Sequence, residues 1–155
     1  MTIREKVISA DTQSVREILR STGFFSPDEI EVAEELVEDG AHMGSEYHFF
    51  FGEENGETIG FTCYGPIALT RSSFDLYWIA VASSSQSKGV GHRLLKVTED
   101  AIRSMGGTRI YIETSTRDLY EPTRAFYLSQ GYKEASILAD FYAPGDGKAT
   151  YVKVL

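Results

Sequence analysis

The sequence predicts an α/β fold with a mixed, twisted sheet of about six or seven strands and helices on both faces. Hydrophobic periodicity indicates the element order βααββ followed by βαβαββ. The strand–helix–strand unit in the middle requires a parallel, right-handed crossover, whereas the hairpin signals toward either end require antiparallel pairing. We expect one domain over residues 1–155, because two independent cores in a chain of this length would each be small.

The first 40 residues predict a short strand and two helices. Apolar and polar residues alternate over residues 3–9, as in a strand. Asp11 is placed to cap a helix that Gly23 ends. Ser26-Pro27-Asp28-Glu29 combines an N-cap serine, a first-turn proline and a capping-box glutamate. A second helix should therefore begin there and close at Gly40.

A hairpin and a central strand are predicted next. Residues 47–52 and 58–64 are aromatic and β-branched runs, and the Asn55-Gly56 dipeptide between them is a strong hairpin signal. The three phenylalanines at 49–51 point to both faces of a strand, so core burial explains them better than a partner-binding surface does. Residues 74–81 are apolar on both faces toward their end, which predicts a central strand.

The second half of the chain alternates between helical and strand periodicity before ending in a hairpin. The predicted elements are a helix over residues 89–105 that Gly106-Gly107 ends, a strand over 109–114, a helix over 122–130, and strands over 132–140 and 150–154 joined across 143–147.

The composition argues against several classes of function. There are 15 basic and 23 acidic residues, and the net charge of −8 argues against nucleic-acid binding. No apolar run is long enough to span a bilayer, and residues 1–10 lack the apolar core of a secretory signal, so we expect a cytoplasmic protein without a membrane partner. Cys63 is the only cysteine and is expected in the core. The three histidines show no metal-ligand spacing, so no metal site is predicted.

The most informative segment joins the central strand to the following helix. After residues 76–81, a small polar loop leads to Gly89-x-Gly91, which opens the helix. Glycines let the backbone approach a ligand, and the free N–H groups and dipole of a helix start suit a pyrophosphate. A tight turn explains the glycines equally well when they are taken alone. The loop lacks the Gly-Lys-Ser/Thr of a Walker motif, and Leu94 stands where a dinucleotide fingerprint has its third glycine.

Three motifs, in the right order, resemble the GNAT N-acetyltransferase family. Gln86-x-x-Gly89-x-Gly91 after its strand resembles the family's acetyl-CoA motif. Residues 125–132 resemble the closing helix, A-x-Y-x-x-x-G followed by an aromatic residue. Residues 111–114 resemble the strand that separates from its neighbour to admit pantetheine. Because the element order also agrees, the resemblance covers nearly the whole chain and implies a GNAT-like fold.

The resemblance implies which residues hold acetyl-CoA, the expected co-substrate. The strand backbone would pair with the pantetheine arm and direct one N–H toward the thioester oxygen, and the loop would hold the pyrophosphate. Arg93 could add positive charge at the helix start. The cofactor-binding residues implied in this way are Ile79, Ala80, Val81, Gln86, Ser87, Lys88, Gly89, Val90, Gly91, His92 and Phe126.

The resemblance also implies catalytic roles for three side chains. Tyr127 aligns with the family's tyrosine whose hydroxyl lies by the cofactor sulfur, which makes it the candidate general acid; a core aromatic is the structural alternative. Glu113 matches the base position of ribosomal-protein alanine acetyltransferases. Asp75 lies on the strand where histone-type acetyltransferases carry a glutamate, although a solvated strand start also explains it. The base would act through water, because the pKa of a carboxylate lies far below that of an amine.

The segment between the last two strands is the candidate acceptor site. In the GNAT fold this hairpin borders the acceptor, which implies that Phe141 and Tyr142, together with Asp140, bind an apolar group beside an ammonium. Turn-forming composition alone explains the segment as a simple loop.

Together, these features imply an acetyl-CoA-dependent N-acyltransferase that moves an acetyl group onto a primary amine by direct attack in a ternary complex. The acceptor would be a small-molecule amine, an amino acid or a peptide N-terminus. The family resemblance also favours a homodimer. The alternative is a non-catalytic module that binds acyl-CoA as a sensor.

Overall fold

The computed structural model describes all 155 residues. Its elements are β1 (Thr2–Arg4), α1 (Asp11–Thr22), α2 (Pro27–Gly40), β2 (His48–Glu54), β3 (Glu57–Pro66), β4 (Ser73–Val81), η1 (Ser83–Ser85), α3 (Val90–Ser104), β5 (Arg109–Ser115), η2 (Asp118–Tyr120), α4 (Glu121–Ser129), β6 (Lys133–Ala143) and β7 (Asp146–Val154). None of the helices is long and apolar enough to cross a membrane.

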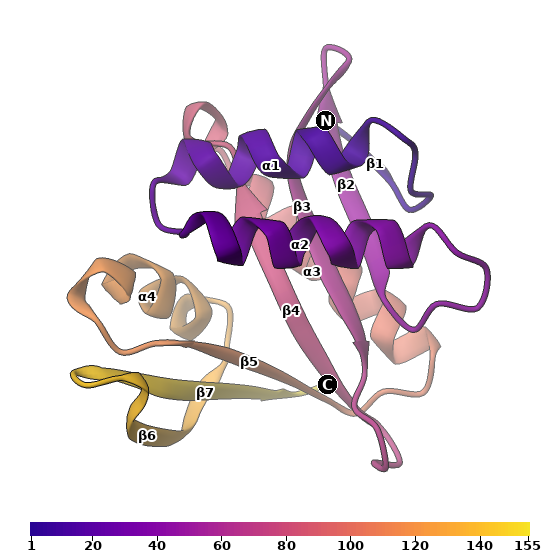
Figure 1. Ribbon diagram of the computed structural model, residues 1–155. Helices are drawn as coiled ribbons and strands as arrows, with labels where there is room; N and C mark the ends of the chain where they lie inside the picture. The colour runs from indigo at the N-terminus through magenta and orange to yellow at the C-terminus, as the bar shows by residue number, and fades with distance from the viewer. The chain divides into compact units, whose positions relative to one another are not determined.

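The seven strands form a mixed sheet, as predicted (Figure 1). The strand order is β1-β2-β3-β4-β5-β7-β6, so β4 lies at the centre of the sheet, which confirms the prediction for that strand. The β4–β5 pair is parallel, and the β1–β2, β2–β3, β5–β7 and β6–β7 pairs are antiparallel.

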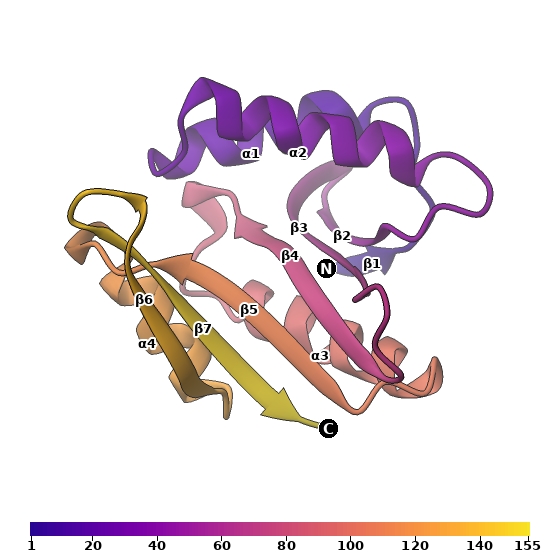
Figure 2. The same cartoon turned by 60° about the horizontal axis from the view of Figure 1, so that its bottom comes forward.

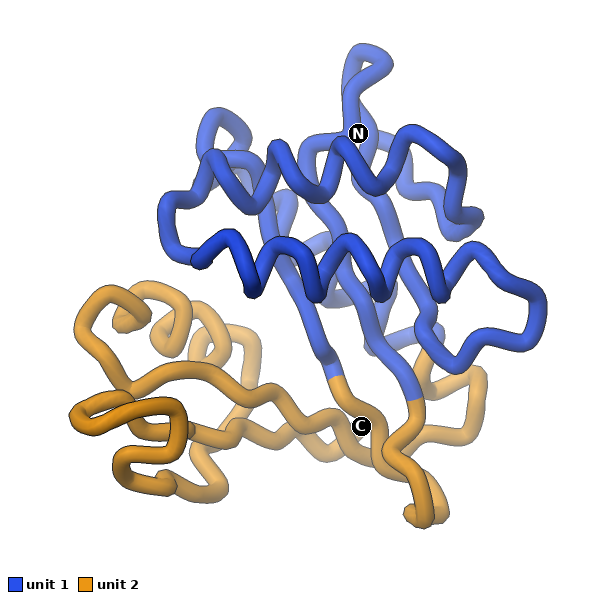
Figure 3. Tube along the Cα trace, in the orientation of Figure 1, with its two compact units in different colours: residues 1–65, 76–101 blue, residues 66–75, 102–155 orange.

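The contacts along the chain divide it into two compact units (Figure 3). Unit 1 comprises residues 1–65 and 76–101, and unit 2 comprises residues 66–75 and 102–155. β4 and α3 each contribute residues to both units.

In unit 1, α1 and α2 lie side by side on one face of the strands and α3 lies on the other (Figures 1 and 2). Phe49 and Phe51 stack on each other at 5.5 Å and belong to the core beneath α1 and α2. Phe50 points to the opposite face, where it stacks on Tyr64 at 5.7 Å. All three phenylalanines are buried, which confirms that they are core residues.

The N-terminal strand is shorter than predicted, because Asp11 engages it. The fully buried Asp11 carboxylate accepts hydrogen bonds from Arg4 Nη1 and Nη2, at 2.9 and 2.8 Å, and from the backbone N–H of Ile8, at 2.7 Å. These bonds draw the chain after β1 into turns. The prediction that Asp11 caps α1 is wrong: Ala10 occupies the N-cap, and Asp11 is the first residue of the helix.

The other predicted helix and hairpin signals are confirmed. Gly23 ends α1 in a left-handed conformation, with φ 73°. Ser26 Oγ accepts the N–H of Glu29, whose carboxylate accepts the N–H of Ser26, so the capping box is complete. The Asn55-Gly56 turn joins β2 to β3 with positive φ at both residues, 53° and 80°.

In unit 2, α4 covers one face of β5 and β7 (Figure 2). The rings of Tyr127 and Tyr151 lie 5.9 Å apart in its core, together with the buried Ile112 of β5. Because side chains alternate along a strand, Tyr111 and Glu113 of β5 lie on the face opposite α4.

The closing hairpin is tighter than predicted. The segment over 143–147, expected as a loop, reduces to a turn in which Gly145 has φ 80°. Asp140 lies inside β6 with φ 56°, and its Oδ1 accepts a hydrogen bond from the N–H of Gly145 at 2.7 Å. The pairing with β7 shifts register between Leu138 and Ala143. The turn-forming residues therefore shape an irregular strand end.

A buried pair of threonines connects β3 to α3 in unit 1. Thr98 Oγ1 donates its only hydrogen to the carbonyl of Leu94, at 2.8 Å. The contact of 2.8 Å between the hydroxyls of Thr62 and Thr98 therefore has Thr62 as the donor. The Thr62 hydroxyl therefore needs Thr98 as its acceptor, whereas the Thr98 hydroxyl keeps its bond to Leu94 when Thr62 is replaced.

We expect Thr98→Val to lower the free energy of unfolding by about 1–3 kcal/mol, because it leaves the Thr62 hydroxyl buried without an acceptor. Thr62→Val should cost about 1 kcal/mol or less, since Thr98 keeps its bond to Leu94. The double variant should cost no more than Thr98→Val alone. Urea unfolding of the three variants measures these differences, and equal losses from the two single variants would contradict the assigned donor.

Candidate active site

The loop after β4 is closed by hydrogen bonds to β3, within itself and to the end of β4. The N–H of Ala82 donates to the carbonyl of Ile59, and the N–H of Ser85 donates to the carbonyl of Ala82, each at 2.8 Å. Gln86 Nε2 donates to the carbonyl of Val81 at 3.1 Å. The Gln86 side chain thus folds the loop back onto the end of the strand.

The chain enters α3 through two left-handed residues. Ser87 has φ 62° and Gly89 has φ 80°, and a Cβ added at Gly89 would meet nothing within 4 Å. Val90, the first residue of α3, is buried, whereas Lys88 and His92 on either side are exposed. The first N–H groups of a helix have no partners within the helix, and the open space at Gly89 leaves room for a ligand beside the start of α3.

A small cavity of about 100 Å³ lies beside this helix start. It is lined by Ser85 and Lys88 of the loop, Val90 and Arg93 of α3, and Glu54 among other residues. The cations of Lys88 and Arg93 and the positive end of a helix dipole suit a phosphate group. Glu54 carries the opposing charge in the lining and lies 4.0 Å from the N-terminal ammonium of Met1. Ser85 was not predicted as a site residue, because a serine in a serine-rich loop carries no distinguishing signal.

The side chains of β4 stop alternating between the two sheet faces just before residues 79–81, whose backbone is predicted to pair with pantetheine. The Tyr77 ring contacts Tyr47 at 5.4 Å, and the ring of the next residue, Trp78, contacts Phe25 at 5.1 Å. Tyr47, Phe25 and Trp78 all pack against the same core, beneath α1 and α2. Consecutive side chains therefore turn to one face. In the segment that follows, Ala80 is buried in that core, and Ile79 and Val81 are partly exposed.

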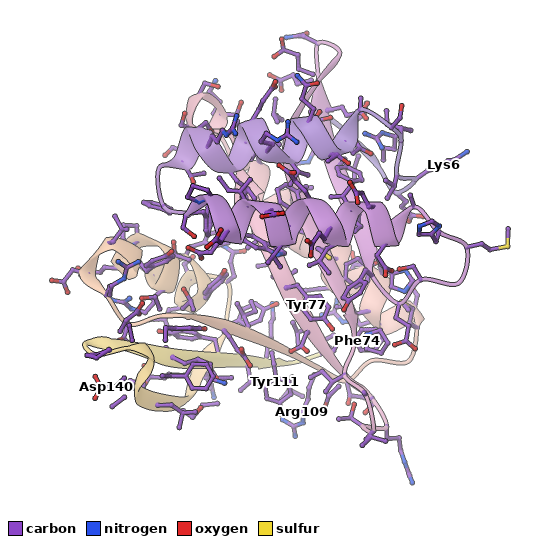
Figure 4. All side chains as sticks on the ribbon, viewed as in Figure 1. Lys6, Phe74, Tyr77, Arg109, Tyr111 and Asp140 are labelled. Atoms are coloured by element: carbon purple, nitrogen blue, oxygen red, sulfur yellow. The ribbon has the colours of Figure 1, made fainter.

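In unit 2, Asp75 and Glu113 lie on one face of adjacent strands. Asp75 pairs in register with Tyr111 of β5, labelled in Figure 4, and Glu113 lies two residues further along the same face. Burial, followed by the charge of Glu113, raises the pKa of Asp75 to about 6. The structure thus brings the two candidate bases together and makes Asp75 a better proton acceptor than an ordinary aspartate.

Lys148 provides a cation on this face that was not predicted from the sequence. Lys148 Nζ of β7 lies 3.6 Å from Glu113 Oε1 and 4.1 Å from the centroid of the Phe141 ring. Only 16% of the Lys148 side chain is exposed. No local motif marks this lysine, because its position depends on the pairing of β7 with β5, in which it lies opposite Ser115.

The candidate general acid, Tyr127, lies in the core of unit 2. Its ring is 5.9 Å from the rings of Phe126 and Tyr151, and 6.2 Å from that of Tyr132. Burial raises the pKa of the Tyr127 hydroxyl well above its usual range, so the group remains protonated at neutral pH, as a proton donor requires. Phe126, its neighbour on α4, is partly exposed.

The three predicted acceptor-binding residues lie at the end of β6. Phe141 and Tyr142 are about half exposed and make an edge-to-face contact at 5.1 Å. Asp140, labelled in Figure 4, is tied into the hairpin turn by its bond to Gly145. Through Lys148, the structure joins Phe141 to the face that carries Glu113.

The comparisons with known proteins assign the chain to a family. A family model described as the acetyltransferase (GNAT) family matches residues 12–132. The chain belongs to the GNAT family. A protein from Desulfovibrio desulfuricans that is assigned to the GNAT acetyltransferases shares 40% sequence identity with this chain, at a TM-score of 0.95, over 99% of this chain and 98% of that one. This family assignment confirms the resemblance found in the sequence.

Two further solved structures share the fold at lower sequence identity. An aminoglycoside 6'-N-acetyltransferase complexed with coenzyme A has 23% identity and a TM-score of 0.79, over 99% of this chain and 97% of that one. A ribosomal-protein-alanine N-acetyltransferase from Brucella melitensis has 20% identity and a TM-score of 0.79, over the full length of both chains. No protein of curated function matches the GNAT chain described here.

We expect Gly89→Ala to weaken acetyl-CoA binding about tenfold or more, because an alanine is strained at φ 80° and would shift the start of α3. Gly44→Ala is the matched control: Gly44 has φ 82° and an equally open Cβ position, but it lies in the loop after α2. Both variants should lose similar stability, and only Gly89→Ala should lose affinity in calorimetric titration. Equal affinity in the two variants would remove this loop from the binding site.

We expect Asp75→Asn to stabilise the protein above pH 6. The pKa of Asp75 is about 6 in the folded chain, above the ordinary aspartate value of 3.8, so ionisation penalises the folded state at neutral pH. Allowing for partial exposure, the gain should be about 1 kcal/mol at pH 7.5 and should vanish as the pH falls below 4. Urea unfolding across this pH range measures it, and a gain that persists at pH 3.5 would point to a cause other than charge.

Proposed function

We propose that the protein is an N-acetyltransferase that moves the acetyl group of acetyl-CoA to a primary amine by direct attack in a ternary complex. Membership of the GNAT family supports the acetyl transfer. The observation that carries the amine acceptor is the pair of carboxylates, Asp75 and Glu113, on the sheet face of unit 2 opposite α4. Two negative charges at one place favour a cationic group, and an amine is cationic until it reacts.

The loop of unit 1 is the proposed acetyl-CoA site. The N–H groups at the start of α3, with Lys88 and Arg93 beside the cavity, provide a positive environment for the pyrophosphate. The positive φ values of Ser87 and Gly89 turn this backbone outward. The aminoglycoside 6'-N-acetyltransferase structure that contains coenzyme A shares the fold, which supports the same co-substrate here.

The proposed reaction requires three proton transfers. The acceptor ammonium first loses a proton to one of the two carboxylates, directly or through water. The free amine nitrogen then attacks the thioester carbonyl carbon and the N–C bond forms. As the C–S bond breaks, Tyr127, whose raised pKa keeps the hydroxyl protonated, gives its proton to the departing thiolate. The second proton of the attacking nitrogen then restores the Tyr127 hydroxyl, which leaves a neutral amide and free CoA thiol.

The acceptor is proposed to be a small-molecule amine, an amino acid or a peptide N-terminus. Two proteins with this fold are named for an aminoglycoside and for a ribosomal-protein alanine, and both names describe N-acetylation. The half-exposed rings of Phe141 and Tyr142 provide apolar surface for the remainder of such a molecule. We propose that residues 1–155 form one catalytic domain that acts in the cytoplasm. We also propose that this domain forms a homodimer, as the family resemblance favours.

We expect the purified protein to release CoA thiol from acetyl-CoA only when an acceptor of one amine class is present. Tyr127→Phe should lower kcat about 10²-fold or more while leaving acetyl-CoA affinity unchanged, because it removes the proton donor and keeps the ring. Tyr132→Phe, a buried tyrosine whose ring contacts that of Tyr127, is the control and should retain activity. Thiol release and calorimetric affinity are measured for all three proteins.

Three outcomes of this assay would contradict the proposal in different ways. Full activity of Tyr127→Phe would remove the tyrosine from the mechanism. Tight acetyl-CoA binding without thiol release across a broad amine panel would favour the sensor. Neither binding nor release would mean that the loop before α3 is only a tight turn.

A further inference from the structure

We propose that Lys148 is a positioning residue of the acceptor site, whose ammonium ties Glu113 to the Phe141 ring so that Glu113 binds the acceptor's ammonium group and Asp75 accepts its proton. This inference rests on the proposed function and assigns separate roles to the two carboxylates that the sequence could not tell apart.

The register of the sheet brings Lys148 and Glu113 to one face. In the β5–β7 pair, Ser115 lies opposite Lys148 and Glu113 lies opposite Thr150. Paired residues share a face, and so do residues two apart on one strand, which places all four side chains together opposite α4. The distance of 3.6 Å from Lys148 Nζ to Glu113 Oε1 agrees with this arrangement.

The burial of Lys148 argues that its position is specified. A lysine ammonium loses hydration free energy when it is buried, so it needs compensating partners. Here the Glu113 carboxylate and the face of the Phe141 ring, 4.1 Å away, supply them. A freely solvated lysine would instead extend into water. The contact connects the end of β6 to the middle of β5.

The Glu113 carboxylate remains open to a second cation. Half of its side chain is exposed, in contrast to the 16% of Lys148. Lys148 Nζ and Glu113 Oε1 form an ion pair at 3.6 Å, which is longer than a charge-assisted hydrogen bond. The Glu113 carboxylate can therefore still accept hydrogen bonds from another group. An acceptor ammonium can approach from the open side while Lys148 holds the carboxylate from the other. Phe141 then offers its half-exposed ring to the acceptor's apolar part.

Asp75 is the better proton acceptor of the pair. It is half-buried on β4, and the contact of Lys148 is with Glu113. Burial and the Glu113 charge raise the pKa of Asp75 to about 6, which brings it closer to the amine that it must deprotonate. In the step, the Asp75 carboxylate gains one proton and the acceptor ammonium becomes a neutral amine.

The other charged and titratable groups on this part of unit 2 include Tyr111, Arg109, Asp146 and Asp140. Tyr111 lies opposite Asp75 in the register, and Arg109, which shares its face of β5, lies opposite Ser73. Asp146 of β7 accepts a hydrogen bond from Ser115 and lies 3.4 Å from Arg117. Asp140 of β6 is engaged by the turn. Replacing Lys148 therefore changes the electrostatic environment of Glu113, which Lys148 contacts, and then that of Asp75, whose pKa depends on the charge of Glu113.

The test compares Lys148→Met with Lys153→Met. Lys153 lies on the same strand with its ammonium 5.5 Å from the Tyr132 ring, but on the opposite face, where it donates to the carbonyl of Gln130 at 2.9 Å. We expect Lys148→Met to raise the pKa of Asp75 by about half a pH unit, because a positive charge leaves the pair. We also expect the KM for the acceptor to rise about tenfold, with a smaller change in kcat. Lys153→Met should leave both unchanged.

The pKa of Asp75 is measured by carboxyl carbon NMR in the protein without acetyl-CoA or acceptor, so this readout needs no turnover. Lys148→Arg should restore the pKa of Asp75 and most of the acceptor KM, because it keeps the positive charge. If Lys148→Met fails to fold, Glu113→Gln tests the same coupling and should lower the pKa of Asp75, since it removes the second cause of the elevation.

The outcomes separate this inference from the proposed function. An active wild type whose acceptor KM and Asp75 pKa do not change in Lys148→Met would overturn the role of Lys148 alone and leave it a structural ion pair. A wild type that acetylates no amine would overturn the proposed function and the acceptor role of Lys148 with it, whatever the NMR titration shows.

Discussion

Repulsion between two carboxylates on neighbouring strands governs the polar face of unit 2. Asp75 and Glu113 lie close enough that the charge of one raises the pKa of the other. Such a pair is tolerated when a cation compensates one member or when the other readily accepts a proton, and this face has both features. Lys148 pairs with Glu113, and the end of β6 lays the Phe141 ring over that lysine. The irregular strand end of β6 thus contributes to an electrostatic arrangement that begins on β4 and β5.

In unit 1 the constraint is on the backbone at the start of α3. The first N–H groups of a helix have no partners within it, and a structure that keeps them open must support the chain around them by other means. Here the carbonyl of Val81 receives the Gln86 side chain, Val90 is buried beneath the helix start, and Ser87 and Gly89 take left-handed conformations. The loop is therefore supported by bonds and packing that do not use the first N–H groups of α3. This distribution of bonds is what an anion site requires.

Helix ends and turns that depend on a few neighbouring residues could be predicted from the sequence. Contacts between distant segments could not. The capping box at Ser26 and the left-handed end at Gly23 depend on local geometry and are confirmed. Asp11 was misread as a cap because its partner, Arg4, lies on a strand whose position only the tertiary structure defines. The same reason explains why Lys148 was missed, since its neighbours follow from the β5–β7 register. The motif residues of the loop and of α4 could be listed from the sequence, but the proximity of Asp75 and Glu113 could not.

Backbone strain and the burial of an ionisable group coincide with the proposed sites. Every buried side-chain nitrogen and oxygen in the protein has a hydrogen-bond partner. The costs that remain include four non-glycine residues with positive φ, namely Asn55, Leu69, Ser87 and Asp140, and an aspartate, Asp75, whose burial opposes its own ionisation. Asn55 and Leu69 lie in the connections before and after β3. Ser87 lies in the proposed cofactor loop, and Asp140 and Asp75 belong to the proposed acceptor site. The coincidence of these last three costs with the proposed sites is what a stability–function trade-off predicts.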